Sequence, residues 1–289
     1  MSRSLVATLA LCAACGGGTP AERPRVFGGD RAVDLQIPPD FDESRRYPLV
    51  LVLHGYTVTG FVQQAYLGLK RLVEDNEAFV VAPTGISNSQ KKPFWNADPA
   101  CCDFEGMNPD DVGYLGGLVD DIVDAWPIDP SRVYAIGHAN GGYMAYRVAC
   151  DRADAFASIV VIAGAAGLDP AACAPSRPVS VLHLHGTADI EFAYTGGGMF
   201  GMTPASPGAV ASVERWAAFD GCSTTRTPGT PLDLDAVVPG AETQPEAFAC
   251  SGGPGVELWT MTGSEHLPNM VDTFVPTVWP WLLDHPAAR

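Results

Sequence analysis

Two residue types that together can move a proton, a carboxylate and an imidazole, follow two apolar runs of this 289-residue chain. Asp189 follows residues 179–185 in the sequence HGTAD, and His266 follows residues 256–262 in TGSEH. In such a pair the imidazole accepts the proton of a hydroxyl group, while the carboxylate holds the imidazole tautomer and stabilises its charged form. A lone Asp is commonly a turn residue and a lone His a packing residue, so the pair gains meaning only beside a position for a nucleophile.

That position lies in residues 133–144, VYAIGHANGGYM, where a β-branched and aromatic run meets a glycine-rich turn and then helix-compatible sequence. A strand, a sharp turn and a helix with the motif G-x-S-x-G form a nucleophile elbow. Gly137 and Gly141 occupy the glycine positions, where the turn needs residues without a side chain, but Ala139 occupies the serine position. The order nucleophile position, acid, histidine is that of α/β hydrolases, so the sequence predicts a serine-hydrolase scaffold whose nucleophile is replaced by a methyl group.

The elements that position these residues alternate along the chain. Strands are expected at residues 33–37, 49–53, 78–82, 133–136, 158–163, 179–185 and 256–262. Helices are expected at residues 61–74, 112–126, 140–150, 208–219 and 270–283. This alternation predicts an α/β fold, with a mostly parallel central sheet covered by helices on both faces. Working groups gather beyond the carboxyl ends of such strands, and the loops at 85–112 and 186–207, rather than a large cap domain, are expected to shape the cleft.

Two backbone N–H groups are expected to stabilise an oxyanion, one from Asn140 after the nucleophile position and one from Tyr56 in the turn after residues 49–53. Aromatic and apolar residues of the two long loops suit an uncharged acyl chain or an aromatic acyl group, although loop packing explains them equally well. These expected substrate-binding residues are Trp95, Tyr194, Met199 and Phe200.

The histidines leave one alternative open. His183 and His185 alternate in one expected strand and so face one side, where with Asp189 they could act as metal ligands. A central strand would bury them, which disfavours a metal hydrolase, and no metal or cofactor is expected. The remaining histidines are expected to be structural or exposed: His54 bracing its turn, His138 in the elbow and His285 at the surface.

The net negative charge of the chain limits the kinds of molecule that it is expected to bind. The formal net charge is −16 and the pI is about 4.6, which argues against nucleic acids and anionic membrane surfaces. An uncharged ester, small or polymeric, fits better, and we expect a monomer. Solubility outside the cell is an alternative explanation of the acidic composition.

The N-terminus is expected to be a targeting segment. Arg3, the apolar run 5–11 and small residues before Cys15 predict a signal peptide over residues 1–15. A cysteine at the cleavage point suggests a lipid anchor, although Cys12 occupies a position where lipoprotein signals usually have Leu. The run is too short to span a bilayer. We expect a tether over residues 16–25, a single catalytic domain over 26–289, and secretion or anchoring outside the cell or in the periplasm.

Six of the eight cysteines remain in the exported part, and an even number there favours disulfides. Cys222 and Cys250 flank one polar, proline-rich segment and are expected to pair, which stabilises by about 3–4 kcal/mol on the chain-entropy account. Adjacent Cys101 and Cys102 are expected to point in opposite directions, towards the two remaining cysteines in an order left open. Those two are Cys150 and Cys173.

Several pieces of sequence between about residues 33 and 268 carry a resemblance to a known family. They are LVLHGY, FWNADPACCDF, DDVGYL, DPSRVYAIGHANGGYMAYRVAC, RPVSVLHLHGTAD, YTGGG and VELWTMTGSEH. The chain resembles the exported polyhydroxybutyrate depolymerase and feruloyl esterase group of α/β hydrolases. The resemblance implies a secreted serine esterase acting on a polyester such as polyhydroxyalkanoate, or on feruloyl or acetyl esters of plant polysaccharide. That group has Ser where this chain has Ala139, and usually Gly where it has Glu265.

Three interpretations follow. The first is an esterase scaffold whose nucleophile was replaced, a common way to trap a substrate, and whose activity is then near background. The second is a natural pseudoenzyme that binds an ester polymer or a glycan without cutting it. The third is the metal hydrolase, and we favour an esterase-family protein in either of the first two forms.

Overall fold

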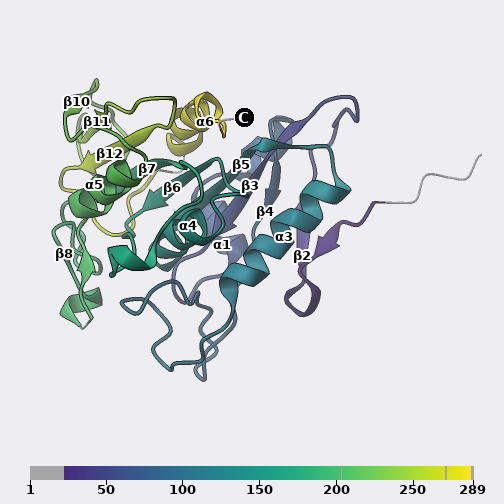
Figure 1. The fold of residues 1–289 in the computed structure, drawn as a ribbon, viewed down its shortest axis with the longest axis horizontal. Helices are drawn as coiled ribbons and strands as arrows, with labels where there is room; N and C mark the ends of the chain where they lie inside the picture. Colours follow the sequence, from purple (N-terminus) through teal and green to yellow (C-terminus); the bar gives the residue numbers. More distant parts are fainter. Residues whose placement is uncertain (1–22, 203, 271, 288–289) are drawn as a thin grey trace, which may run out of the picture.

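The computed structural model describes residues 23–202, 204–270 and 272–287, and its centre is a twisted sheet (Figure 1). In the described part of the chain this sheet has ten strands in the order β1-β2-β4-β3-β5-β6-β7-β12-β11-β10. The strands are β1 (Val26–Phe27), β2 (Val33–Gln36), β3 (Tyr47–Leu53), β4 (Phe79–Val81), β5 (Ile128–His138), β6 (Ser158–Ile162), β7 (Ser180–Gly186), β10 (Arg226–Pro228), β11 (Thr243–Phe248) and β12 (Val256–Met261). The run from β4 to β12 is parallel, and antiparallel strands extend it at both ends. The α/β expectation is therefore confirmed.

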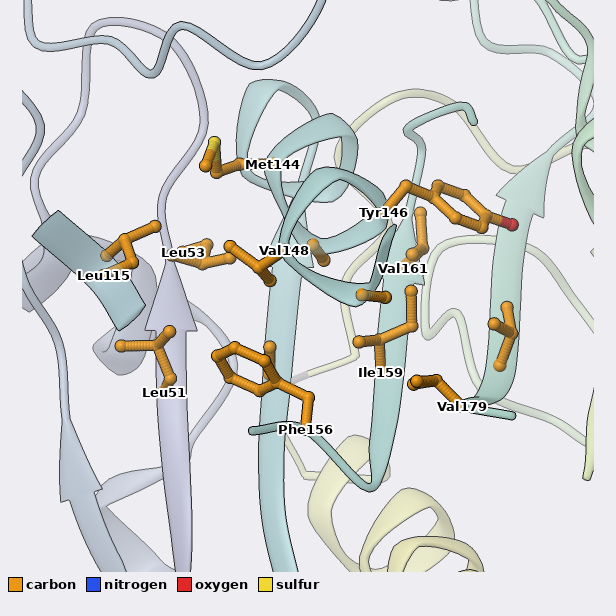
Figure 2. Packing of buried hydrophobic residues seen from close by; sticks show 14 of the residues in the cluster. Leu51, Leu53, Leu115, Met144, Tyr146, Val148, Phe156, Ile159, Val161 and Val179 are labelled. Carbon is orange, nitrogen blue, oxygen red and sulfur yellow. The ribbon is translucent and has the colours of Figure 1, made fainter. Parts of the chain in front are cut away.

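Helices cover both faces of the sheet because its central strands are apolar on both sides. The helices are α1 (Gly60–Tyr66), α2 (Lys70–Glu74), α3 (Asp111–Ala125), α4 (Asn140–Asp151), α5 (Ala209–Phe219) and α6 (Phe274–Asp284). Successive side chains of a strand point to opposite faces. Leu51 and Leu53 of β3 accordingly pack with Leu115 of α3 and Val148 of α4 (Figure 2), while Val52 packs in a second core with residues of α2 and α6.

Element boundaries differ from expectation where backbone geometry intervenes. The expected helix at 61–74 is two helices, because Gly68 adopts a φ of +65° between them. The elbow strand begins at Ile128, five residues before the expected start, and passes through Pro130. Its register against β3 shifts between Tyr47 and Leu49, and proline inside a sheet is tolerated at such irregularities.

Some strands were not expected from sequence. The polar segment between Cys222 and Cys250 contains β10 and β11, which pair antiparallel with each other and, through β11, with β12. A short ribbon of β8 (Gly196–Gly197) and β9 (Ser206–Pro207) lies in the loop after β7. These strands contain proline and polar residues, so the sequence pattern does not predict them. Their extended conformation depends on pairing with a neighbouring strand.

The disulfides confirm one expected pairing and correct another. Cys222 is joined to Cys250, as expected. Cys101 and Cys102 are joined to each other, and Cys150 is joined to Cys173, so the expectation that the adjacent pair reaches these two cysteines is wrong. The reason is local, because Cys150 near the end of α4 and Cys173 after a short 3-10 helix have Cα atoms 5.5 Å apart, within bonding reach.

The expected signal peptide, Cys12 and Cys15 lie outside the described residues, as does most of the expected tether. The described end of that tether contacts the domain: the indole N–H of Trp126 donates to the Pro24 carbonyl at 2.8 Å, and the Leu35 N–H donates to the Arg25 carbonyl at 2.7 Å. Within the described ranges, none of the helices has the length and apolar character needed to cross a bilayer.

A buried carboxyl at the end of α5 sets a pH dependence of stability. Asp220 is 6% exposed, and neither of its oxygens has a partner with hydrogen-bond geometry in the described part of the chain. Burial raises the pKa of Asp220 from 3.8 to about 7. The backbone N–H of Val179 and the indole N–H of Trp216 lower this pKa, but their effect is smaller than that of burial. Between these values the folded state retains a proton that the unfolded chain has lost, so folding stability falls as pH rises from about 4 to 7.

We therefore expect Asp220→Asn to be more stable than the parent above pH 7, by about 1–3 kcal/mol, and close to the parent at pH 4. Urea denaturation of both proteins at the two pH values measures this difference. Asp124→Asn, on the exposed side of α3, is the control and should change neither value. An unchanged pH dependence in Asp220→Asn would contradict the assignment.

Candidate active site

The turn between β5 and α4 has the geometry that a nucleophile elbow needs. Ala139 caps α4 with φ 52° and ψ −119°, a conformation that residues with a side chain rarely adopt. The flanking glycines are forced by close backbone contacts: a Cβ at Gly137 would lie 2.0 Å from the Gly141 carbonyl oxygen, and one at Gly141 would lie 2.1 Å from the Leu53 carbonyl oxygen. The Ala139 N–H donates to the Ile162 carbonyl at 2.9 Å. The Ala139 side chain is therefore held at the carboxyl end of the parallel strands.

Asp189 and His266, 77 residues apart, meet at the same edge of the sheet. The Nδ1 of His266 lies 2.8 Å from Oδ2 of Asp189, while Oδ1 of Asp189 accepts the N–H groups of Glu191 and Phe192 at 2.8 and 2.9 Å. Because a carboxylate can only accept, Nδ1 of His266 carries the proton and its Nε2 is left as an acceptor. Burial alone would raise the pKa of Asp189, but hydrogen bonds from His185, His266 and the backbone hold it below its usual value, so the carboxylate is charged.

The loop that carries His266 is tied to the elbow. Nε2 of His138 donates to the His266 carbonyl at 2.9 Å, and the two rings lie 4.9 Å apart. Burial lowers the pKa of His138 to about 3, so this side chain is neutral and acts structurally, as expected from sequence. Oε2 of Glu191 lies 3.7 Å from Nε2 of His266. A carboxylate that sequence reasoning did not single out therefore faces the acceptor side of the imidazole.

A cavity of about 530 Å³ brings the elbow and the histidine together, because Ala139 and His266 both line it. This volume is in the range of small-molecule sites. Its other walls include Tyr56, Met199 and Leu267, and they are predominantly apolar. A second cavity of about 330 Å³, walled by α4 and α5, contains neither Ala139 nor His266.

The two expected oxyanion donors lie in braced turns. The N–H of Gly55, next to Tyr56, donates to Oε1 of Gln63 at 3.1 Å. The Asn140 side chain accepts the Trp95 N–H at 2.7 Å and donates to the Trp95 carbonyl at 2.9 Å. Neither the Tyr56 N–H nor the Asn140 N–H donates to an acceptor among the described residues. The N–H groups of Tyr56 and Asn140 are thus left without an acceptor in this part of the chain, and Tyr56, unlike Asn140, is a wall of the cavity.

Of the four expected substrate-binding side chains, Met199 alone lines this cavity in the described part of the chain. Trp95 is fully buried, with its indole N–H donated to the His54 carbonyl at 3.1 Å, because Asn140 holds its main chain against the elbow. The hydroxyl of Tyr194 is bonded to Thr260 instead, at 2.8 Å. Phe200 is 59% exposed and is not a wall of the cavity.

The other histidines occupy their ring nitrogens within the protein. Nε2 of His54 accepts the Gly85 N–H at 2.8 Å, and burial lowers its pKa to about 4, so it braces the turn as expected. His285 is half-buried rather than simply exposed, because its Nδ1 donates to the Trp281 carbonyl at 2.7 Å. His183 and His185 lie on one face of β7 in a chain of hydrogen bonds, and no group of three His, Cys, Asp or Glu side chains suited to a metal is found among the described residues.

Other cavity residues were missed by sequence reasoning. Glu191 and Phe192 could have been found by their closeness to Asp189, since the loop after an acid commonly turns into the site. Gln63 and Tyr66 could not, because they belong to α1. The helical pattern of α1 predicts which residues face the core but not that its buried side reaches the edge of the sheet.

The parallel sheet, the elbow and the acid–histidine pair beyond the strand ends define the α/β-hydrolase fold. The chain belongs to the family described as "Putative esterase", whose family model matches residues 25–224. Putative esterase NocK of Nocardia uniformis subsp. tsuyamanensis is 32% identical over 174 residues, which is 59% of this chain and 48% of that protein. Feruloyl esterase B of Piromyces equi is 27% identical over 247 residues, which is 82% of this chain and 42% of that protein.

The chain spans about half the length of these two curated relatives. Among solved structures, an acetyl xylan esterase from Aspergillus awamori superposes with a TM-score of 0.62 at 15% identity, over 91% of this chain and 98% of that one. At this identity the likeness is one of fold. Family and fold agree with the resemblance that the sequence pieces carry.

Proposed function

We propose that this chain has the site of a serine-type carboxylic ester hydrolase in which Ala139 occupies the nucleophile position. The observation that supports this most is that Ala139, in an elbow with φ 52°, shares one cavity with a histidine whose Nδ1 is bonded to Asp189. In this proposal Nε2 of His266 is the general base. The N–H groups of Tyr56 and Asn140 bind the oxyanion.

With a hydroxyl at position 139, the reaction follows from these roles. The hydroxyl oxygen attacks the acyl carbon of the ester while its proton passes to Nε2 of His266. The tetrahedral oxyanion forms beside the two N–H donors, and the alcohol then leaves with the proton from His266. Water, deprotonated by the same nitrogen, releases the acid and restores the hydroxyl. The methyl group of Ala139 cannot form the acyl bond, so the chain as it stands binds the ester without turning it over.

A fluorophosphonate probe tests this assignment without depending on the natural substrate. It reacts with an activated serine and forms a covalent adduct. We expect one adduct per chain in Ala139→Ser, located at residue 139 by peptide mass mapping, and none in the parent. A folded Ala139→Ser protein that stays unlabelled would show that the histidine or the oxyanion donors are misassigned.

The substrate we propose is an acyl ester of plant polysaccharide, such as a feruloyl or acetyl ester. An apolar cavity suits an uncharged acyl group, and the similar proteins named above are called feruloyl and acetyl xylan esterases. Six cysteines joined in three disulfides support a place outside the reducing cytosol. If the natural chain also has Ala139, we propose that the protein is a pseudoenzyme, which binds such an ester without hydrolysing it.

A polyester is the second candidate, and exposed apolar side chains among the cavity walls or next to them in sequence favour it. Phe61 is 78% exposed beside Val62, Ile190 is 80% exposed beside Glu191, and Leu267 is 63% exposed; Val62, Glu191 and Leu267 line the cavity. Exposed apolar groups gathered at one site suit an apolar partner.

If the polymer is the substrate, Phe61→Ser and Ile190→Ser should lower adsorption to polyhydroxybutyrate granules. In the Ala139→Ser background they should lower the ratio of granule to soluble-ester turnover. Val26→Ser is the control, since Val26 is 57% exposed on β1 at the sheet edge. Equal adsorption by all variants, with preference for feruloylated xylan, would select the polysaccharide ester.

A further inference from the structure

A continuous chain of buried hydrogen bonds runs from α4 to the acid of the candidate site. The hydroxyl of Tyr146 lies 2.9 Å from Nδ1 of His183, and Nε2 of His183 lies 3.1 Å from Nδ1 of His185. Nε2 of His185 lies 2.8 Å from the Phe192 carbonyl oxygen and 3.3 Å from Oδ2 of Asp189. Tyr146, His183 and His185 are 2%, 0% and 2% exposed, respectively. Tyr146 extends from α4 on the side opposite Met144 (Figure 2).

The direction of every hydrogen bond in this chain follows from its last member. A carbonyl oxygen and a carboxylate oxygen can only accept, so Nε2 of His185 must carry a proton. In a neutral imidazole Nδ1 of His185 then accepts, which requires a proton on Nε2 of His183. Nδ1 of His183 accepts in turn, so the Tyr146 hydroxyl donates. All three donors therefore point along the chain towards Asp189.

The neutral forms of His183 and Tyr146 are consistent with the burial of these two side chains. Burial lowers the pKa of His183 well below its usual value, and the neighbouring His185 adds to this effect. Tyr146 stays protonated because burial raises the pKa of its hydroxyl. The hydrogen-bond partners along the chain thus determine which nitrogen of each histidine carries the proton.

We propose that His185 is a positioning residue of the site: its Nε2–H holds the turn that carries the Asp189 carboxylate in the orientation that meets His266. This inference rests on the proposed function, since the orientation matters only where His266 acts as a base.

Two contacts of the turn support this role. The Phe192 carbonyl is held by His185, and the Phe192 ring lies 5.6 Å from the His266 ring. The other oxygen of Asp189 is already held by two backbone N–H groups of the same turn. A flipped His185 tautomer would place a lone pair of Nε2 against two acceptor oxygens. The donation from His183 to Nδ1 of His185 opposes that flip, and Tyr146 fixes His183 in the same way.

Imidazole NMR of the ¹⁵N-labelled chain as it stands tests the proton arrangement without any turnover. We expect His183 and His185 as Nε2–H tautomers at neutral pH, and His266 as the Nδ1–H tautomer. Tyr146→Phe should destabilise the Nε2–H tautomer of His183, whereas Tyr134→Phe, which removes a buried hydroxyl without a hydrogen-bond partner, should not. A proton on Nδ1 of His185 overturns the inference, whatever the activity of the protein.

Kinetics in the Ala139→Ser background test the consequence for the reaction. His185→Phe should lower kcat about ten- to hundredfold, the effect of one lost hydrogen bond to a charged group, with KM little changed. His185→Gln, whose amide can donate in place of Nε2–H, should recover most of the loss. Equal kcat in a folded His185→Phe protein, shown by circular dichroism, overturns the positioning role.

The pH profile separates positioning from general loss of structure. Without the His185 N–H the charge of Asp189 is less compensated, which favours the protonated form of its other partner, His266. The acid limb of the profile should therefore move to higher pH in His185→Phe and return in His185→Gln. The other titratable groups facing His266, namely Glu191 and His138, are unchanged in these variants. An acid limb that stays in place in His185→Phe contradicts the inference. An Ala139→Ser protein that is inactive although its NMR tautomers are as expected refutes the proposed function alone.

Discussion

Ala139→Ser is expected to hydrolyse a short-chain p-nitrophenyl ester about 10³- to 10⁶-fold faster than the chain as it stands. Removing the serine of a serine hydrolase lowers kcat by about 10⁶ and leaves about 10³–10⁴ over water from the oxyanion hole and binding. The introduced hydroxyl would enter a site in which the acid–histidine pair and the two turns are already in place. The glycines at 137 and 141 already allow the close backbone approaches, so the change needs little repacking.

The measurement is steady-state turnover of parent and variant purified side by side, with folding matched by circular dichroism. Ala165→Ser, another buried alanine outside the cavity walls, controls for an added hydroxyl and should stay at the parent level. A parent that turns over rapidly after exhaustive purification would mean that Ala139 is not the nucleophile position. A folded but inactive Ala139→Ser would identify a binding protein that has lost more than one residue.

His266→Ala in the Ala139→Ser background should return turnover to the level of the parent. The nucleophile and its base act as a unit, so removing either costs about as much as removing both. Asp189→Asn should lower kcat by about 10⁴, because the amide no longer fixes the proton on Nδ1 of His266. The His266→Ala effect should be absent in the parent, where no hydroxyl needs a base. Activity that survives His266→Ala would mean that another group accepts the proton.

The pH dependence of turnover by the Ala139→Ser protein should have one acid limb, which comes from the His266 imidazole. Protonated His266 cannot accept the hydroxyl proton, so turnover should fall as this side chain is protonated. Asp189 does not add a second limb near neutral pH. Burial raises the pKa of its carboxyl, but the hydrogen bonds from His185 and His266 lower it by more, so the pKa stays below the usual value. Its contribution to folding stability is present above the pKa of an unfolded carboxyl and is lost as pH falls through the lowered value. The measurement is kcat/KM against pH, beside urea denaturation at acid pH.

The sequence alone predicted those parts of the site that depend on short-range pattern. Aliphatic runs such as residues 49–53 indicate buried strands, and the spacing of Gly137, Ala139 and Gly141 indicates a sharp turn. Asp189 and His266 could be chosen because residues just after parallel strands gather at one edge of the sheet. These inferences need only local periodicity and one rule of topology.

Tertiary structure alone decided what lines the cavity and what supports the acid. Trp95 and Phe200 look alike in sequence as loop aromatics, yet one is fully buried behind the elbow and the other is 59% exposed. Gln63 lines the cavity from α1, and the spacing of apolar residues in this helix predicts only which of its side chains are buried.

The cysteines and the paired histidines show the same division. An even number of cysteines after residue 15 predicts disulfides, but only proximity in the fold joins Cys150 to Cys173. His183 and His185 alternate in the sequence as metal ligands can, and only the positions of Tyr146 and Phe192 turn them into a hydrogen-bond chain. The physical reason is the range of the interactions. Strand and turn preferences act between neighbours in the chain, whereas cavity walls, disulfides and buried proton positions depend on contacts between residues far apart in sequence.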